Sequence, residues 1–121
     1  MIIGIGTRRG VTKQEVTDAV NEALTDLHLS LADVECFASS VLKADESGLI
    51  EAVLEMGKNI VFLEDDVLNE AVPLSVPLSE SQAERFGLRG VSEPAALALS
   101  NHKKLITTKK VYGRVTIAIA E

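Results

Sequence analysis

Short strand-like runs alternate along the chain with stretches in which apolar residues recur every three or four positions. The strand-like runs span 1–5, 36–42, 59–63, 104–108 and 115–120, and the first and last of them are almost entirely apolar. Apolar runs of this length are typical of strands that are covered on both faces. The last two runs flank a short Lys/Gly segment, 109–114, which predicts a β-hairpin with its turn in that segment.

Helical spacing fills the intervals between these strands. The clearest example runs from Val16 to Leu27, where apolar and acidic residues alternate with the period of an amphipathic helix. Shorter helices are expected at 45–56, 67–71, 79–87 and 92–99, and the prolines at 73 and 77 bracket a loop. Strands that alternate with helices and end in a hairpin predict a single α/β domain, with three α/β/α layers and a mixed, mostly parallel sheet.

Residues that commonly begin or end helices support these boundaries. Ser, Thr and Asp accept hydrogen bonds from the free amides of a first helical turn, and glycine suits the position just past the last turn. The predicted N-terminal caps are Thr12 with Glu15, Asp45, Ser79 with Gln82, and Ser92, and the predicted C-terminal caps are Gly57 and Gly87.

The first ten residues combine a strand, a glycine-bearing loop and the approach to a helix N-terminus. Such a junction is a place where anions bind, because free amides point out of the helix end. Glycine lets the backbone turn sharply or approach a ligand closely, and arginine adds a permanent positive charge. The residues concerned are Gly4, Gly6, Thr7, Arg8, Arg9 and Gly10.

The loop does not match the familiar nucleotide-binding motifs. A dinucleotide fingerprint places its third glycine where Arg9 stands, and a phosphate-binding loop ends in Gly-Lys-Ser/Thr, whereas Val11 and Thr12 follow Gly10 here. Two interpretations therefore stay open. Either the loop binds an anionic ligand, or the glycines simply form a tight turn and the arginines face water.

Composition excludes several classes of function. The chain has 121 residues, 46% of them hydrophobic, which fits one globular domain with a single core. Its 12 basic and 18 acidic residues give a net charge of −6, which argues against a nucleic-acid partner. Aromatic residues make up only 3%, so platforms for stacking bases are scarce.

Cysteine and histidine residues are too few to form a disulfide or a metal site. Cys36 is the single cysteine and is expected in the core, while His28 and His102 have no partner at ligand spacing. We therefore expect neither a metal nor another cofactor. No apolar stretch reaches the roughly 20 residues of a membrane helix, and no signal peptide is evident, so a cytoplasmic protein without a membrane partner is expected.

Basic residues gather at the predicted turns rather than on helix faces. They are Arg8, Arg9, Lys43, Lys109, Lys110 and Arg114, and in an acidic protein this placement predicts a polyanionic ligand. Ligands of open α/β sheets bind outside the carboxyl ends of the strands, so we expect 4–10, Lys43 and the loop 90–92 to converge on one cleft. Glu46 and Glu93 are the acids near these loops that could transfer a proton; the alternative is that each only stabilises the N-terminus of its helix through the helix dipole.

Four blocks of sequence, taken in order, carry a resemblance to a known family. They are Gly4-Ile-Gly-Thr-Arg-Arg-Gly-Val11, Lys43-Ala-Asp-Glu-Ser-Gly-Leu49, Gly90-Val-Ser-Glu-Pro-Ala-Ala-Leu97 and the closing segment from Lys109 through Ala120. Together they resemble the CobE family of cobalamin biosynthesis, which matches the C-terminal domain of CbiG. The resemblance spans the whole chain.

This resemblance implies a role in building the corrin ring. Full-length CbiG is cobalt-precorrin-5A hydrolase, which opens a lactone and releases acetaldehyde, and this chain resembles only its C-terminal domain. The implied ligand is a precorrin or cobalt-precorrin, whose many carboxylates Arg and Lys would clamp. The expected substrate-binding residues are Gly6, Thr7, Arg8, Arg9, Gly10, Lys43, Glu46, Ser92 and Lys109, and the expected catalytic residue is Glu93.

Other classes of function stay open at this point. The chain could be a non-catalytic module that binds anions or nucleotides, or a structural subunit that completes an enzyme carried on another chain. A second protein of the cobalamin pathway is an expected partner in the latter case. A homo-oligomer also stays open.

Overall fold

The computed structural model describes residues 1–70 and 91–121. Its helices and strands are β1 (Ile2–Thr7), α1 (Lys13–Asp26), β2 (Cys36–Ser40), α2 (Ser47–Glu55), β3 (Ile60–Leu63), α3 (Asp65–Glu70), α6 (Ser92–Leu99), β4 (Leu105–Tyr112) and β5 (Val115–Ala120), with short 3₁₀ turns η1 (Leu31–Asp33) and η2 (Val41–Lys43). The cap expected at Ser79 and Gln82, the helix end at Gly87, the loop between the prolines and Gly90 lie outside the described residues.

The strands form one mixed sheet in the order β3-β2-β1-β5-β4. β1 pairs with β2, and β2 with β3, in parallel, whereas β5 is antiparallel to both β1 and β4. Four strands therefore run one way and β5 runs the other. This confirms the predicted mixed sheet with a C-terminal hairpin.

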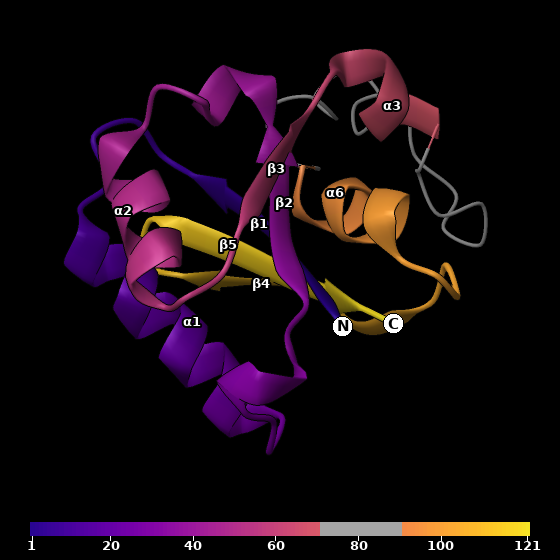
Figure 1. Cartoon of the computed structure of the whole chain (residues 1–121), viewed down its shortest axis with the longest axis horizontal. Coiled ribbons are helices and arrows are strands. Elements are labelled where there is room, and N and C mark those ends of the chain that lie inside the picture. The colour runs from indigo at the N-terminus through magenta and orange to yellow at the C-terminus, as the bar shows by residue number, and fades with distance from the viewer. Residues whose placement is uncertain (71–90) are drawn as a thin grey trace.

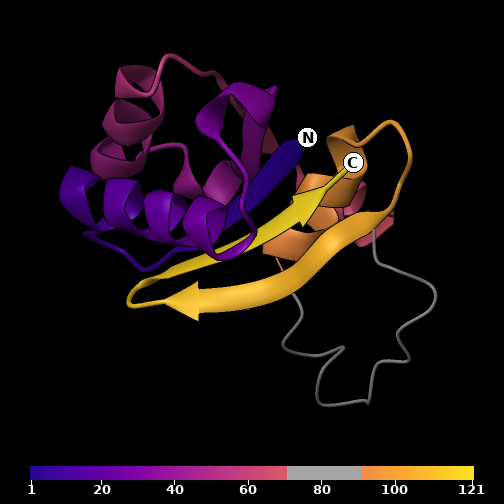
Figure 2. The ribbon, with the colours of Figure 1, turned by 90° about the horizontal axis from the view of Figure 1, so that it is seen from below.

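Helices cover both faces of the sheet, which gives the three predicted layers (Figures 1 and 2). On one face, α1 and α2 pack on a core that includes Ile3, Phe37 and Ile117. On the other face α6 packs across β1, β2 and β5, with α3 beside it. Alternation along β1 explains this, because Ile3 and Ile5 point to the first core while Ile2 belongs to the smaller core under α6.

The contact between α6 and β1 is unusually close. A Cβ built on Gly4 would lie 1.8 Å from the carbonyl oxygen of Ser92 and 2.6 Å from the amide nitrogen of Ala96. On the helix side the contact is made by small residues, and Ala95 and Ala96 are fully buried. Glycine in this strand therefore serves the approach of a helix, as glycines in strands often do.

Two of the predicted helix caps are confirmed. At the start of α1, the Glu15 amide donates to Thr12 Oγ1 and the Thr12 amide donates to Glu15 Oε1, each at 3.1 Å. Past the end of α2, Gly57 has a φ of +76° and its amide donates to the carbonyl of Leu54. A positive φ here is the reason glycine suits the position.

The caps predicted at Asp45 and Ser92 are wrong. The N-cap of α2 is Glu46, without a capping side chain, and Asp45 instead pairs with Arg9. The N-cap of α6 is Val91, whose φ of −70° and ψ of −40° are already helical. Ser92 therefore lies inside the first turn, whereas a capping side chain requires an extended backbone at its own residue.

The hairpin turn is shorter than predicted. Lys109 and Lys110 belong to β4, which continues to Tyr112, and the turn consists of Gly113 and Arg114. Gly113 has a φ of +63°, as two-residue hairpin turns require. The lysines are thus strand residues.

None of the helices in the described ranges is long and apolar enough to cross a membrane.

The close contact at Gly4 leads to a test of the fold. Gly4→Ala should lower the free energy of unfolding by about 2 kcal/mol or more, because its methyl group cannot fit against the α6 backbone. Urea unfolding followed by circular dichroism measures this. An unchanged midpoint would contradict the described contact between α6 and β1.

Candidate functional site

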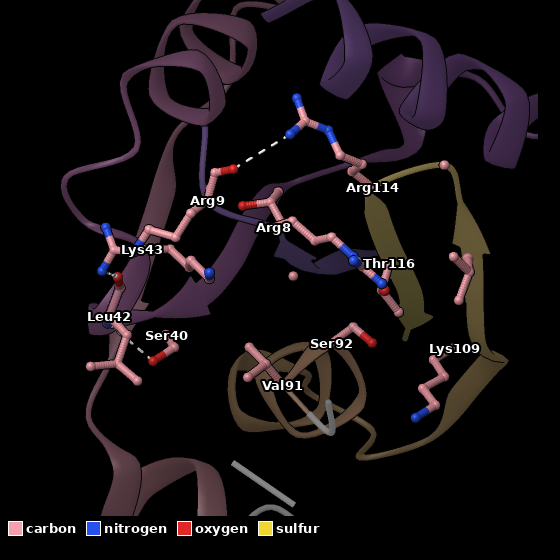
Figure 3. A pocket seen from close by; sticks show the side chains of 14 residues that line it. Arg8, Arg9, Ser40, Leu42, Lys43, Val91, Ser92, Lys109, Arg114 and Thr116 are labelled. Atoms are coloured by element: carbon pink, nitrogen blue, oxygen red, sulfur yellow. Dashed lines mark hydrogen bonds between the residues drawn. The ribbon is translucent and has the colours of Figure 1, made fainter. Parts of the chain in front are cut away.

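A pocket of about 570 Å³ lies where β1 and β2 end, between the first turn of α6 and the β4–β5 hairpin (Figure 3). We call it the strand-end pocket. Its lining residues are Gly6, Thr7, Arg8, Arg9, Ser40, Leu42, Lys43, Val91, Ser92, Lys109, Val111, Gly113, Arg114 and Thr116. The pocket occupies the position expected of a ligand site in an α/β sheet, outside the carboxyl ends of parallel strands.

The structure brings most of the predicted site residues together. Those that line the strand-end pocket are Gly6, Thr7, Arg8, Arg9, Lys43, Ser92 and Lys109. Gly10, Glu46 and Glu93 are not among the lining residues. Arg9 and Ser92, which are distant in sequence, meet at one pocket as expected.

Sequence reasoning missed the polar side chains on the floor of the pocket. Ser40 and Thr116 come from strands on either side of β1, and each shares the α6 face of the sheet with Gly6. Alternate residues of a strand point to opposite faces of the sheet. Because Val115 and Ile117 belong to the core on one face, the alternation alone would have placed Thr116 on the other face. The alternation does not tell which strands lie beside β1, so it could not place Ser40 and Thr116 next to Gly6.

Five basic residues line the strand-end pocket, and none of its described lining residues is acidic. They are Arg8, Arg9, Lys43, Lys109 and Arg114. This concentration contrasts with the net charge of −6 of the whole chain. The pocket is therefore a local positive region on an acidic protein, which attracts anions.

Two of the arginines are held by acidic residues outside the pocket. Arg9 forms an ion pair with Asp45 at 2.9 Å, and Arg114 binds Glu15, with Nε to carboxylate oxygen at 2.7 Å. The Arg9 guanidinium lowers the pKa of Asp45 below its usual value. In the described part of the chain, Arg8 forms neither a hydrogen bond nor an ion pair through its side chain. It is therefore available to a ligand.

Lys43 is the second basic side chain that is available in this way. Lys43 follows β2 in the turn η2, and its side chain forms no hydrogen bond or ion pair with the described residues. Figure 3 shows Lys43 and Arg8 on adjoining sides of the strand-end pocket.

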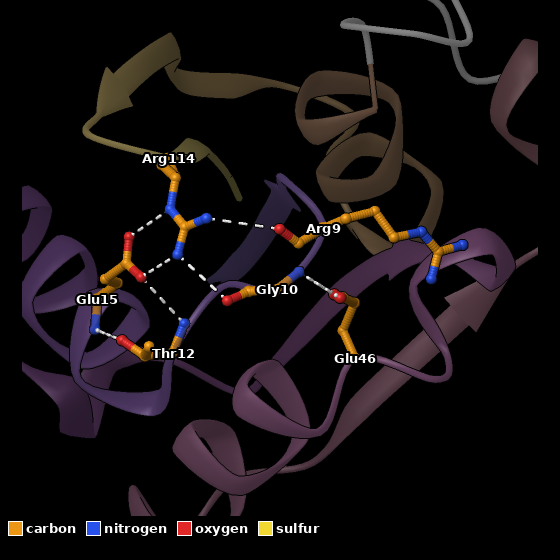
Figure 4. A network of polar contacts seen from close by, with 6 residues as sticks. All are labelled: Arg9, Gly10, Thr12, Glu15, Glu46 and Arg114. Carbon is orange, nitrogen blue, oxygen red and sulfur yellow. Dashed lines mark hydrogen bonds and ion pairs between the residues drawn. The ribbon is translucent and has the colours of Figure 1, made fainter.

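A network of polar contacts shapes the arginine-bearing loop (Figure 4). The Gly10 amide donates to the Glu46 carboxylate at 2.9 Å, and Arg114 donates to the Gly10 carbonyl at 3.2 Å. Gly10 has a φ of +78°, which turns the loop back toward the hairpin. Glu46 is only 7% exposed, so its carboxylate is occupied in holding this loop.

Glu93 is likewise engaged in a backbone contact. Its carboxylate accepts a hydrogen bond from the Lys109 amide at 3.2 Å, which attaches the first turn of α6 to β4. This contact fixes the position of β4, the strand whose residues Lys109 and Val111 line the pocket.

The Ser92 hydroxyl is buried and has no hydrogen-bond partner in the part of the chain that the structure describes. Ser92 is 1% exposed, its Oγ has no hydrogen-bond partner among the described residues, and its side chain points into the strand-end pocket (Figure 3). Leaving a buried hydroxyl unpaired costs about 1–3 kcal/mol, so such groups call for an explanation. The Thr7 hydroxyl is also unpaired, but alternation places it on the opposite face with Ile3 and Ile5.

The site chemistry in the described ranges is that of anion binding. No cluster of three or more His, Cys, Asp or Glu side chains there could hold a metal ion. The lining side chains supply positive charge and hydroxyl groups, which bind and orient carboxylates.

Comparison with known proteins identifies the family. The family model described as cobalamin synthesis G C-terminus matches residues 1–120. The chain belongs to this family. Membership of a cobalamin biosynthesis family confirms the resemblance carried by the four sequence blocks.

Among curated relatives of this cobalamin synthesis G C-terminal domain, the cobalt-precorrin-5A hydrolase of Priestia megaterium is 33% identical over 120 residues. A probable cobalt-precorrin-5A hydrolase of Methanocaldococcus jannaschii is 32% identical. The two alignments cover 99% and 98% of this chain, respectively. They cover only 32% and 39% of the length of the two relatives. Protein CobE of Sinorhizobium sp is 30% identical, with 99% of this chain and 79% of that protein aligned.

Solved structures agree with this assignment. The crystal structure of CobE from the cobalamin biosynthetic pathway superposes with a TM-score of 0.80 at 30% identity, covering 97% of this chain and 86% of that one. Cobalamin biosynthesis protein chiG from Agrobacterium tumefaciens gives a TM-score of 0.74 at 26% identity, with 99% and 98% covered. The α/β fold is therefore that of CobE.

The contact between Arg114 and Glu15 predicts a pH dependence of stability. The hydrogen bond from Arg114, and then that from the Thr12 amide, lowers the pKa of Glu15 from 4.5 to about 2. Because the folded-state pKa is depressed, the stabilisation is present above about pH 4.5 and is lost as the pH falls toward 2. Glu15→Gln should therefore lose less stability than the wild type across this range. Urea unfolding at pH 5 and pH 2.5 tests this, and equal losses would contradict the pairing.

Proposed function

We propose that the strand-end pocket binds a precorrin or cobalt-precorrin through its carboxylates. In this role the domain supports the opening of the lactone of cobalt-precorrin-5A, with release of acetaldehyde. The observation that carries the proposal is the convergence of five basic residues on one pocket whose described lining includes no acid. Membership of a cobalamin biosynthesis family supports a tetrapyrrole as the ligand class.

The chemistry of the pocket suits a polycarboxylate. An arginine fork binds a carboxylate through two charged hydrogen bonds, and lysine adds a mobile positive charge. Arg8 and Lys43 make no competing ion pair among the described residues. A pocket of about 570 Å³ falls within the usual range for small-molecule sites, so it can enclose part of a macrocycle and its carboxylate arms.

The same observations favour this ligand over a nucleotide. None of the described lining residues is aromatic, so a base would find no ring on which to stack. Leu42 and Val111 are 56% and 70% exposed on the rim, where they offer apolar contact to a large flat ligand.

A supporting role, rather than complete catalysis by this domain, follows from two observations. The chain spans about a third of the length of the two hydrolases. No acidic or histidine side chain lines the described pocket, which leaves proton transfer to a group brought by another segment or chain. A second protein of the cobalamin pathway is accordingly the proposed partner.

Removing an available cation tests the binding proposal. Arg8→Ala and Lys43→Ala should each weaken the binding of cobalt-precorrin-5A by about tenfold, because each deletes a charged hydrogen bond to a carboxylate. Absorbance titration of the purified protein measures the dissociation constant.

Lys110→Ala is the matched control for these variants. The substitution Lys110→Ala also removes one positive charge. Lys110 is adjacent to Lys109 on β4, but it does not line the pocket. The Lys110→Ala variant should bind cobalt-precorrin-5A with the affinity of the wild type at the same salt concentration. Equal loss in all three variants would indicate only long-range attraction and would contradict a specific clamp.

Glu93 has a separate test, because its predicted catalytic role competes with the contact to Lys109. Glu93→Gln should keep precorrin affinity and acetaldehyde release, since its amide oxygen can accept the same hydrogen bond from the Lys109 amide. Glu93→Ala should lower affinity by releasing β4. The assay reconstitutes this domain with the remaining part of a full-length hydrolase. Abolished release in Glu93→Gln with unchanged binding would restore a catalytic role for Glu93.

A further inference from the structure

Gly6 is a glycine that neither its backbone conformation nor its packing against the described residues requires. It lies within β1, paired with Thr116 of β5, and its φ is outside the left-handed region. A Cβ built on it would find Val91 Cβ at 3.9 Å as its nearest described neighbour. Glycine weakens a strand by raising the entropy lost on folding, so its presence here needs another cause.

Gly4 shows what a packing requirement looks like on the same strand. It precedes Gly6 by two residues and therefore shares its face, toward α6. A Cβ on Gly4 would collide with the helix backbone at 1.8 Å, whereas among the described residues a Cβ on Gly6 would meet only Val91 Cβ, in ordinary van der Waals contact at 3.9 Å. The helix thus accounts for one glycine and not for the other.

The space above Gly6 is part of the strand-end pocket. Val91, the one described neighbour of the built Cβ, also lines that pocket. Beside it lies the unpartnered, 1% exposed hydroxyl of Ser92, and the side chain of Arg8 extends across the same region (Figure 3). An open backbone surface, an unused donor and an available cation therefore adjoin one another.

We infer that Gly6 determines ligand specificity by keeping the surface of β1 open to one carboxylate-bearing arm of the ligand. The arm lies against the Gly6 backbone and reaches Ser92, whose hydroxyl donates a hydrogen bond to a carboxylate oxygen. Arg8 neutralises the same carboxylate. This inference rests on the proposed function, and it assigns to that function a site for one arm.

The inference separates stability from binding at Gly6. Gly6→Ala should fold at least as stably as the wild type, because its methyl group meets no described residue closer than 3.9 Å and alanine loses less entropy. The same methyl group occupies the space of the ligand arm. Binding should weaken by about tenfold or more, as overpacking of a filled site does.

The test measures both properties with cobyrinic acid, a coloured cobalt corrin that carries carboxylate arms. Absorbance titration gives the dissociation constant, and thermal unfolding without ligand gives the stability of each variant. Ser92→Ala is the second variant and should also weaken binding without loss of stability, because it removes a buried unpaired hydroxyl. The double variant should bind no more weakly than the worse single one, since both changes affect the same arm.

The outcomes distinguish this inference from the proposed function. Cobyrinic acid binding equally to wild type and Gly6→Ala would overturn the inference and leave the proposed function intact. Failure of cobyrinic acid to bind the wild type would overturn both. A Gly6→Ala protein that unfolds more readily than the wild type would also overturn the inference, because the position would then be constrained by packing.

Discussion

The arrangement of this domain depends on the contact of the α6 backbone with the backbone of β1 at Gly4. No side chain separates the two elements there, so the helix lies against the sheet at a distance that alanine would forbid. That contact positions the first turn of α6 beside the ends of β1 and β2. Val91 and Ser92 then line the pocket, and Glu93 reaches the amide of Lys109 on β4.

The acidic residues of the chain are used around the pocket rather than inside it. Glu15 holds Arg114, Asp45 holds Arg9, and Glu46 holds the amide of Gly10. These contacts bend the arginine-bearing loop toward the hairpin. An acidic protein thereby presents a pocket whose described lining carries basic and no acidic side chains. The available charges of Arg8 and Lys43 are then the ones that a carboxylate ligand can use.

Binding and catalysis are separable in this picture. In the proposed function, the basic and hydroxyl side chains of the described site hold and orient a polycarboxylate macrocycle, and few of its groups could move a proton. The hydrolases of the same family contain this region as about a third of their length. By contrast, this chain aligns with 79% of the length of CobE. A protein made largely of this one domain therefore exists in the family. A domain that binds the intermediate and depends on another segment for its chemistry is consistent with both kinds of relative.

The amino-acid sequence alone was sufficient for the layers, the hairpin and the capping box at Thr12, because apolar periodicity and local hydrogen bonding are properties of neighbouring residues. It also indicated five of the basic residues that line the pocket, since strand ends of an α/β sheet meet at one edge, but it wrongly included Lys110, which does not line it. It failed at Ser92 and Asp45, whose side chains have the chemistry of caps but whose roles depend on backbone angles and on a distant arginine. It could not separate Gly4 from Gly6, because the two differ only in what lies above them. That difference, like the burial of the unpaired Ser92 hydroxyl, was decided by the place where α6 crosses the sheet.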